Sequence, residues 1–518
     1  MAGINELKKQ IDEKNSHVIL GIDPTDDMKE DIEKAGGLEQ YIKGLIDQTG
    51  EYIVGIKPNL AFFEGSEYSR KIMGKCIGYA ASKNLVTILD AKRGDIMSTQ
   101  AMYTEADGAN FNPDIATIHA YSGADAITPY LDKDIDTIAM AAMSNPGAKL
   151  QDRISGGLRM YQHMALDAHE IGGDRTGFVV GATKVQAMKD IRMAEKEYDL
   201  EPGMVLAPGF GRQGGNLDFV SIAGKNAVYP ISSGLTNPKH LDGRTPAEAA
   251  KDWRDAINTE LENTKDIPSI TQHVVDSMIK EGFIIIPESP DVVTWPLLKK
   301  GREKLASADI DIKGLSDSER QDLLQEKLTD GTLNQDDFAG PMNPFMEIRD
   351  ISDSPETQRY LAFLYKKKIE ESGVEYDKIG SVAYGAIATG SIVAEYLEEP
   401  SFLLRKERGA EATHKDIVGR VKTGETAIMI EDVTTSADSL IKDVEMLRQK
   451  YGANITDAFV FCKRTDEGED NCRKHNINLH YICDMDKLSD MIARSKYVPD
   501  AIKATMTGSQ SSKEEFNF

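Results

Sequence analysis

The sequence is poor in the residues that build disulfide frameworks, metal clusters and membrane spans. Only four of its 518 residues are cysteine: Cys76, Cys462, Cys472 and Cys483. They form no CxxC pair and no metal-ligand spacing, so we expect free thiols in a reducing, cytoplasmic compartment. No apolar run approaches the roughly 18 residues that span a bilayer. Lys8 and Lys9 are not followed by the apolar segment of a signal peptide.

Positive charge is also scarce. The chain has 61 lysines and arginines against 85 aspartates and glutamates, which gives a formal net charge of −24. A protein this acidic repels nucleic-acid backbones and anionic membranes unless a local basic patch overrides the mean, so we expect neither as a partner. A site for an anionic substrate must concentrate the few cations that are present. Lysines and arginines beside glycine-rich loops are therefore the first candidates for function.

Strand-like apolar runs alternate with helical stretches from residue 17 to about residue 235. This alternation predicts a parallel sheet, and eight such units fit a (β/α)8 TIM barrel. The expected strands are HVILGID (17–23), YIVGIKP (52–58), LVTILDAK (85–92), DAITPY (125–130), IAMAAMSN (138–145), GFVVGAT (177–183), MVLAPGFG (204–211) and AVYPISS (227–233). Residues 246–264 have helical periodicity and are expected to close the barrel. The first predicted domain is residues 1–265.

A second α/β pattern follows, from residue 266 to 505. It opens with a helix leading into a strand, ITQHVVDSMIKEGFIII (270–286). Further strand-like runs are IGSVAYG (379–385), SFLLRKE (401–407), TAIMIEDVTTS (426–436) and ITDAFVFCKR (455–464). Helical stretches separate them, which predicts a doubly wound sheet. The charge-dense segment at about 298–337 is either an insertion in this domain, which we favour, or a linker. The polar tail at 506–518 is expected to be disordered.

The stretch LVTILDAKRGDI (85–96) carries the strongest chemical signal in the first domain. Asp90 and Lys92 are two residues apart at the end of a strand, so their side chains project to the same side. Lys57 and Asp23 end the two preceding strands, and the carboxyl ends of barrel strands form the catalytic mouth. Interleaved opposite charges keep one another ionised when buried. A carboxylate placed against a substrate carboxylate, beside an ammonium that stabilises and protonates a carbanion, would favour cofactor-free decarboxylation.

A glycine-rich loop, PGFGRQGG (208–215), follows the seventh expected strand. Glycines let backbone N–H groups approach a phosphate, and barrels commonly bind phosphate after their seventh and eighth strands. The candidate phosphate contacts are Gly211, Arg212, Gln213 and Gly214. A plain turn is the alternative interpretation, because a glycine-rich loop alone is a weak signal.

These segments, with GIDP (21–24), KPNLAFFE (57–64), TPY (128–130), SNPG (144–147) and VVGAT (179–183), resemble the orotidine 5'-monophosphate decarboxylase family over about residues 1–264. The resemblance implies that Lys57, Asp90, Lys92 and Asp95 form the catalytic network, with Lys92 as the proton donor. It also implies that Asp95 reaches the site of a neighbouring subunit, which predicts a homodimer or a higher homo-oligomer. Hexulose-phosphate synthases share the barrel and a DxKxxD motif and are the nearest alternative.

The same resemblance assigns substrate contacts in the barrel: the ribose to Asp23 and Thr99, the pyrimidine to Ser144, and the phosphate to Gln213. One stretch departs from the family pattern. Relatives carry Ser-Arg-Gly after the eighth strand, and this chain has Ser232, Ser233 and Gly234. The missing arginine would grip the phosphate with two hydrogen bonds. Arg212 is the candidate replacement.

TAIMIEDVTTSADSL (426–440) combines a strand, two acids and a hydroxyl-rich turn into a helix. The turn and the helix N-terminus offer N–H donors to a phosphate. Hydroxyls accompany them at Thr434, Thr435, Ser436 and Ser439. Glu431 and Asp432 are placed to accept ribose hydroxyls or to hold Mg²⁺ through water. A simple helix N-cap is the alternative, because Ser and Thr favour that position. RKERGAEATHK (405–415) adds cations on an expected mobile loop, which suits pyrophosphate departure.

These segments, with PFMEIRD (344–350) and CKR (462–464), resemble the orotate phosphoribosyltransferase family over roughly residues 268–490. The resemblance implies a type I phosphoribosyltransferase fold that uses Mg²⁺ with phosphoribosyl pyrophosphate. It implies that Arg405, Lys406 and Arg408 bind the pyrophosphate, with Lys406 and Arg408 acting in catalysis. Tyr384 would contact the phosphoribosyl donor, and Arg464 would contact orotate.

The two resemblances describe consecutive reactions. The leading hypothesis is that orotate and phosphoribosyl pyrophosphate give orotidine 5'-monophosphate, which the barrel decarboxylates to uridine monophosphate. Three departures affect the first step: Gly409 stands where relatives have Lys, Ala437 where they have Gly, and residues 336–340 lack their Lys-Ser-Gly. The second hypothesis is therefore a decarboxylase whose transferase-like domain is inactive and serves assembly or regulation. A third, a regulator that senses nucleotide or binds DNA, is disfavoured by the acidic charge.

Overall fold

The computed structural model describes residues 3–210, 217–286, 299–312, 315–334, 337–338, 345–346, 348–383, 385–405 and 416–504, with the backbone alone at 299, 317, 318, 345, 349 and 350. The chain divides into two compact units, Met1–Ser269 and Ile270–Phe518.

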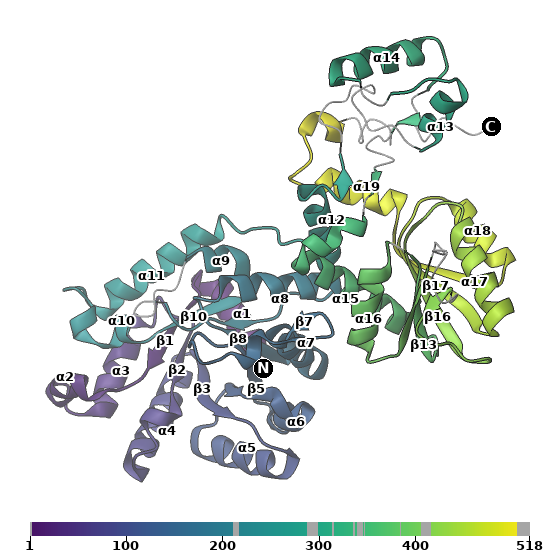
Figure 1. Ribbon diagram of the computed structural model, residues 1–518. Helices are drawn as coiled ribbons and strands as arrows, with labels where there is room; N and C mark the ends of the chain where they lie inside the picture. The colour runs from purple at the N-terminus through teal and green to yellow at the C-terminus, as the bar shows by residue number, and fades with distance from the viewer. Residues whose placement is uncertain are drawn as a thin grey trace. The chain divides into compact units, whose positions relative to one another are not determined.

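Eight parallel strands close into a barrel in the first unit, which confirms the predicted fold (Figure 1). The strands follow one another around the barrel in chain order. They are β1 (Val18–Ile22), β2 (Gly55–Pro58), β3 (Val86–Arg93), β4 (Ile115–Ile118), β5 (Asp136–Ala142), β8 (Thr176–Val180), β9 (Val205–Leu206) and β10 (Ala227–Ile231). A short hairpin, β6 (Ile154–Ser155) and β7 (Leu158–Arg159), follows β5.

Helices surround the barrel, and one helix closes the end that is formed by the amino ends of the strands. The surrounding helices are α2 (Lys29–Lys34), α3 (Leu38–Thr49), α4 (Glu67–Ser82), α5 (Met97–Phe111), α6 (Ala124–Leu131), α7 (Met160–Gly172), α8 (Val185–Glu197), α9 (Asp218–Ala223), α10 (Ser233–Thr236) and α11 (Pro246–Leu261). In α1 (Gly3–Lys14), Ile4, Leu7 and Ile11 pack with interior residues such as Val54 and Val228. The amino ends of the strands are thereby sealed, which leaves the carboxyl ends as the open mouth.

One strand of the barrel was predicted in the wrong place. DAITPY (125–130) belongs to helix α6, and the fourth strand is β4, whose sequence is IATI. In α6 the buried residues Ala126, Ile127 and Tyr130 repeat at three- and four-residue spacing, which is helical. Six residues are too few to distinguish the period of a helix from that of a strand. β4, with only four residues, was not predicted.

The second unit contains a six-stranded sheet in the order β15-β14-β13-β16-β17-β18, with β15 antiparallel to its neighbour. The strands are β13 (Lys378–Ser381), β14 (Ser401–Leu404), β15 (Ile417–Val418), β16 (Thr426–Thr434), β17 (Asn454–Lys463) and β18 (Asn478–Asp484). Helices α15 (Pro355–Ser372) and α16 (Ile387–Leu397) cover one face, and α17 (Asp438–Tyr451) and α18 (Asp466–Lys474) cover the other (Figure 1). This is the predicted doubly wound arrangement, and its strand order reverses between β13 and β16.

Smaller elements complete the second unit. Helix α12 (Ile270–Lys280) leads into β11 (Ile284–Ile285), which pairs with β12 (Phe345–Met346), and α19 (Met485–Arg494) follows β18. Within the charge-dense segment, α13 (Lys299–Ser307) and α14 (Asp317–Thr329) share a small core of Leu305, Leu324, Leu333 and Phe338.

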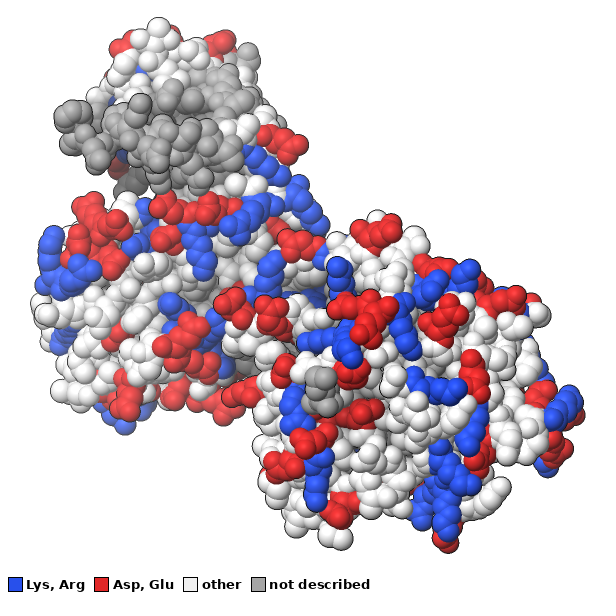
Figure 2. All heavy atoms as spheres, turned by 180° about the vertical axis from the view of Figure 1, so that it is seen from behind, with Lys and Arg blue, Asp and Glu red and all other residues white. Residues whose placement is uncertain are grey.

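The cysteines agree with the sequence prediction of free thiols, because all four are unpaired and buried. Among the residues that the structure describes, no helix is long and apolar enough to cross a membrane. Basic and acidic side chains are interspersed over the face drawn in Figure 2.

Candidate active sites

The carboxyl ends of the barrel strands surround a cavity of about 550 Å³. Its wall brings together five residues that were predicted from the sequence: Asp23, Lys57, Asp90, Lys92 and Ser144. Its apolar wall includes Met140, Val179 and Leu206 from β5, β8 and β9. The cavity is therefore a charged pocket with an apolar side, at the end of the barrel where the alternation of strands and helices predicted a site.

Asp90 lies at the centre of the charge network in this cavity. Its Oδ2 accepts a hydrogen bond of 2.5 Å from Lys57 Nζ, and its Oδ1 accepts one from Lys92 Nζ. Lys57 and Asp90 are each only 6% exposed. Lys92 is more open to solvent, with 39% of its side chain exposed. The buried pair is thus fixed inside the barrel, while the Lys92 ammonium borders the space that a substrate would fill.

The pKa values of the buried pair reflect their mutual attraction. Burial opposes ionisation of Asp90, but Lys57 and Lys92 outweigh it and hold the pKa of Asp90 well below its usual range. Burial likewise opposes the charge of Lys57, and attraction from Asp90 and Asp23 raises its pKa above the usual value. Both groups therefore remain charged despite the low-dielectric surroundings. These pKa directions are the ones expected for interleaved opposite charges.

Two residues of the cavity were missed with strand β4. Thr117 donates a hydrogen bond of 2.8 Å to Asp90 Oδ1, and His119 lines the wall beside it. Burial, with the nearby Lys92 charge, lowers the pKa of His119. The available signal was IATIH (115–119), a short β-branched run that ends in a polar residue as the neighbouring strands do.

The remaining predicted residues of the first site are placed differently. Asp95 lies between β3 and α5, and Thr99 lies at the start of α5. Neither belongs to the cavity wall of this single chain.

Asp23 faces the cavity, and its buried Oδ1 has no hydrogen-bond partner among the described residues. It is therefore positioned to accept a donor from a bound molecule.

The predicted phosphate loop lies mostly outside the described residues, which exclude Gly211, Arg212, Gln213 and Gly214. Its described beginning, Gly209 and Phe210, lines the cavity together with Ser232 and Ser233. Ser233 begins helix α10, at the position where the resemblance predicts arginine. Hydroxyls and the N-terminus of this short helix thus face the cavity at that end.

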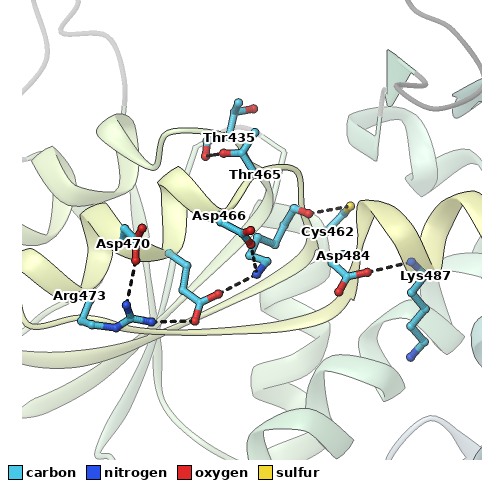
Figure 3. A network of polar contacts seen from close by, with 10 residues as sticks. Thr435, Cys462, Thr465, Asp466, Asp470, Arg473, Asp484 and Lys487 are labelled. Carbon is cyan, nitrogen blue, oxygen red and sulfur yellow. Dashed lines mark hydrogen bonds and ion pairs between the residues drawn. The ribbon is translucent and has the colours of Figure 1, made fainter. Parts of the chain in front are cut away.

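In the second unit, the predicted phosphate turn follows β16 at the carboxyl edge of the sheet. The turn lies at the point where the strand order reverses, and ligands of open α/β sheets bind there. Thr465 Oγ1 donates a 2.8 Å hydrogen bond to the carbonyl of Thr435 (Figure 3). Asn471 donates one to the carbonyl of Ser436. A Cβ at Gly468 would approach the Thr435 carbonyl to 2.3 Å. Side chains at the start of α18 and within it therefore donate hydrogen bonds to the carbonyls of this turn.

The two acids before this turn differ in exposure. Glu431 is buried, and its backbone carbonyl accepts a hydrogen bond of 2.7 Å from Tyr365. Asp432 is half-buried, and its Oδ1 accepts the backbone N–H of Val433. Its Oδ2 lies against Gly385, where a Cβ would come within 1.7 Å. Asp432 is thereby directed toward the loop that follows β13.

Some of the other predicted residues of the second site lie among the described residues, and some do not. Thr434 is buried at the end of β16, whereas Thr435 and Ser439 are exposed at the turn and the first turn of α17. Arg405 is exposed at the end of β14, and the backbone N–H of Arg464 bonds the Thr434 carbonyl. The predicted Tyr384, Lys406 and Arg408 lie outside the described residues, as does Gly409.

Ala437 occupies the left-handed conformation that the family pattern assigns to glycine. Its φ is 62° and its ψ is 10°, directly before α17. An L-residue in this region is strained by its Cβ, and glycine is not. We expect Ala437→Gly to raise the free energy of unfolding by about 1 kcal/mol, because relief of strain exceeds the added entropy of the unfolded chain. Urea unfolding of the full chain measures this change.

The matched control is Ala394→Gly in α16, a buried alanine with ordinary helical backbone. It should lower the free energy of unfolding by about 1 kcal/mol. Equal losses for both variants would show that the conformation of Ala437 carries no strain.

Comparison with known proteins finds relatives of the first unit and of the full chain. The family model described as orotidine 5'-phosphate decarboxylase / HUMPS matches residues 16–234. An orotidine 5'-phosphate decarboxylase of Flavobacterium johnsoniae is 34% identical over 234 residues, which cover 43% of this chain and 82% of the relative. The bifunctional enzyme PyrF/PyrE of a Nostoc species is 22% identical over 517 residues, 96% of this chain and 98% of the relative. The solved UMP synthase of Leishmania donovani is 20% identical, with a TM-score of 0.44, and covers 99% of this chain and 100% of that one.

Proposed function

The chain belongs to the orotidine 5'-phosphate decarboxylase / HUMPS family, and on that premise we propose that its first unit converts orotidine 5'-monophosphate to uridine monophosphate and CO2. The observation that carries the proposal is the buried Asp90, held charged between Lys57 and Lys92 at the mouth of the barrel. This arrangement provides for decarboxylation without a cofactor.

The mechanism follows from the placement of these charges. A substrate carboxylate bound beside Asp90 meets a negative charge that the lysines keep ionised, and loss of CO2 removes that repulsion. The C6–carboxylate bond breaks, its electron pair stays on C6, and the Lys92 ammonium stabilises the carbanion. Lys92 Nζ then gives its proton to C6 and regains one from water. Ser144 orients the pyrimidine, Asp23 and the Thr99 side chain hold the ribose, and the 208–215 loop with Ser233 holds the phosphate.

The low pKa of Asp90 predicts the pH dependence of this step. Because Asp90 ionises well below the usual range, it is charged throughout the range from about pH 5 to pH 8. We expect kcat/KM, which reports the ionisation of the free enzyme, to show no acid limb from this carboxylate within that range. Its contribution to stability should be present above the unfolded pKa and lost as the pH falls through the lower folded pKa. A kcat/KM profile with an acid limb near pH 6 that disappears in Asp90→Asn would contradict this assignment.

We further propose that the second unit transfers the phosphoribosyl group to orotate, so that the chain performs two consecutive steps. The support is the full-length similarity to a bifunctional relative and the turn after β16 at the switch point of a doubly wound sheet. Thr434, Thr435, Ser436 and Ser439 would bind the ribose 5-phosphate, together with the N-terminus of α17. Arg405, Lys406 and Arg408 would bind the departing pyrophosphate, Tyr384 the donor, and Arg464 orotate.

Mg²⁺ fits the acids of this second site. The described residues contain no cluster of three or more His, Cys, Asp or Glu side chains that would hold a metal, so most ligands would come from phosphoribosyl pyrophosphate and water. Glu431 and Asp432 would hold the ion through that water. When bound, Mg²⁺ would neutralise charge on the pyrophosphate leaving group.

We also propose that the barrel pairs with a second copy of itself. Asp95 lies outside the cavity of a single chain, as expected for a residue that reaches a neighbour's site, and Thr99 lies outside this cavity as well. Large apolar side chains are exposed beside them in the chain at Ile96, Met97 and Met102, and Tyr121 is exposed after β4. A homodimer would cover this surface, and light scattering on the purified chain measures its presence.

The experiment that tests the two-step proposal supplies orotate, phosphoribosyl pyrophosphate and Mg²⁺ and follows the products by chromatography. We expect orotate to fall and uridine monophosphate to appear. If orotate persists while added orotidine 5'-monophosphate is decarboxylated, the second unit is inactive and only the first step of the proposal stands. Failure of both would remove the proposal.

A further inference from the structure

The segment that carries the central charges is a break in the barrel ladder. β3 and β4 pair regularly from Ile88 with Ile115 to Leu89 with Ala116, and the next pair is Arg93 with Ile118. Between these pairs β3 advances from 89 to 93 while β4 advances only from 116 to 118. The extra residues of β3 form a bulge, a device that re-aims side chains beside active sites. Asp90 and Lys92 both lie in it.

Lys92 has an unfavourable backbone conformation in this bulge. Its φ is 50°, in the left-handed region that side chains other than those of Gly, Asn and Asp seldom adopt. Such a conformation persists only where the surroundings fix it. Within the interrupted part of the ladder, the backbone N–H of Lys92 donates a hydrogen bond of 3.1 Å to a side chain, at Thr117 Oγ1.

Thr117 makes a second bond from the same hydroxyl. Its O–H donates to Asp90 Oδ1 at 2.8 Å, so one oxygen joins the backbone of Lys92 to the carboxylate of Asp90. The Lys92 ammonium bonds the same Oδ1. Thr117 is 1% exposed, which protects this bridge from competition by bulk water.

We propose that Thr117 is a positioning residue for the decarboxylation proposed above: its hydroxyl fixes the bulged backbone of Lys92 against Asp90 and thereby sets where the proton-donating ammonium lies. The inference rests on that proposed function. The Lys92 stem is long and partly exposed, so without the bridge both the backbone and the ammonium gain freedom. Because the ammonium acts on charge that develops in the transition state, the loss should lower kcat rather than substrate affinity.

The test compares Thr117→Val, which keeps the shape and removes both hydrogen bonds, with Thr117→Ser, which keeps the hydroxyl. We expect Thr117→Val to lower kcat for decarboxylation about 10- to 100-fold, the range for loss of a hydrogen bond to a charged group. KM should change by less than about threefold. Thr117→Ser should retain most of the wild-type kcat. If Thr117→Val does not fold, Thr117→Ala against Thr117→Ser makes the same comparison.

Thr137→Val is the matched control. Thr137 is equally buried on β5, and its hydroxyl bonds that of Thr176 at 2.9 Å, away from the Asp90–Lys92 bulge. It should lose stability without a comparable loss of kcat. Wild-type kcat in Thr117→Val, or equal losses in the Val and Ser variants, would overturn the positioning role. An inactive wild type would instead remove the decarboxylase proposal itself, so the two failures are distinguishable.

Discussion

Replacing Lys92 by alanine is expected to lower kcat/KM for decarboxylation on the order of 10⁵-fold, because the change removes both proton transfer and carbanion stabilisation. The protein should still fold, since Asp90 keeps its hydrogen bonds from Lys57 and Thr117. Lys92 is itself partly exposed, so no uncompensated buried charge remains. Decarboxylation of added orotidine 5'-monophosphate by the purified variant measures the loss.

A control variant and a second activity of Lys92→Ala show whether this loss is specific to decarboxylation. Lys83→Ala removes an exposed lysine that pairs with Asp47 at 2.9 Å, and it should change the rate by no more than about twofold. Consumption of orotate by Lys92→Ala should equal that of the wild type, and orotidine 5'-monophosphate should then accumulate. A variant with more than a hundredth of the wild-type kcat/KM would mean that another group donates the proton.

The central charges of the barrel were predictable because strand-end geometry is local. An apolar run that ends in Asp90 and Lys92 is enough to place both side chains at the mouth, whatever the rest of the chain does. Lys57 follows by the same rule from the neighbouring strand. The pKa shifts then follow from proximity and burial, which any closed barrel with these residues would produce.

The bulge and its support were not predictable in the same way. The left-handed backbone of Lys92 and the role of Thr117 depend on how β3 and β4 pair, and these strands are 25 residues apart at that contact. β4 itself is only four residues long, so periodicity gives it little signal. Tertiary pairing, and not local preference, decides the position of the Lys92 ammonium.

In the second unit the sequence predicted a turn and the structure supplied its conformation. The motif at 430–439 predicted the turn before α17, and the glycine expected at Ala437 is explained by a φ of 62°. β18 was not predicted, because NLHYICD mixes polar and apolar residues at the margin of the sheet, where half-buried positions tolerate both. The support that α18 gives to the turn through Thr465, Gly468 and Asn471 required the fold.

The double substitution Glu431→Gln and Asp432→Asn is expected to lower kcat/KM for orotate consumption on the order of 10³-fold. Each change removes a charge-assisted contact to the ribose or to water on Mg²⁺, and such contacts contribute about 1.5–3 kcal/mol each. Both replacements keep the shape of the side chain, so the packing around Tyr365 and Gly385 should persist. Mg²⁺-dependent consumption of orotate with phosphoribosyl pyrophosphate measures the effect.

The control for this second site is Glu445→Gln on α17, an acid that bonds His475 at 2.6 Å rather than facing the turn. It should leave the rate within about twofold of the wild type. The double variant should also decarboxylate added orotidine 5'-monophosphate normally, because the charge network for that step is built from residues of the barrel. Loss of both activities would indicate that these acids support the fold of the chain instead of binding the phosphoribosyl donor, and unchanged orotate consumption would place the donor elsewhere on the sheet.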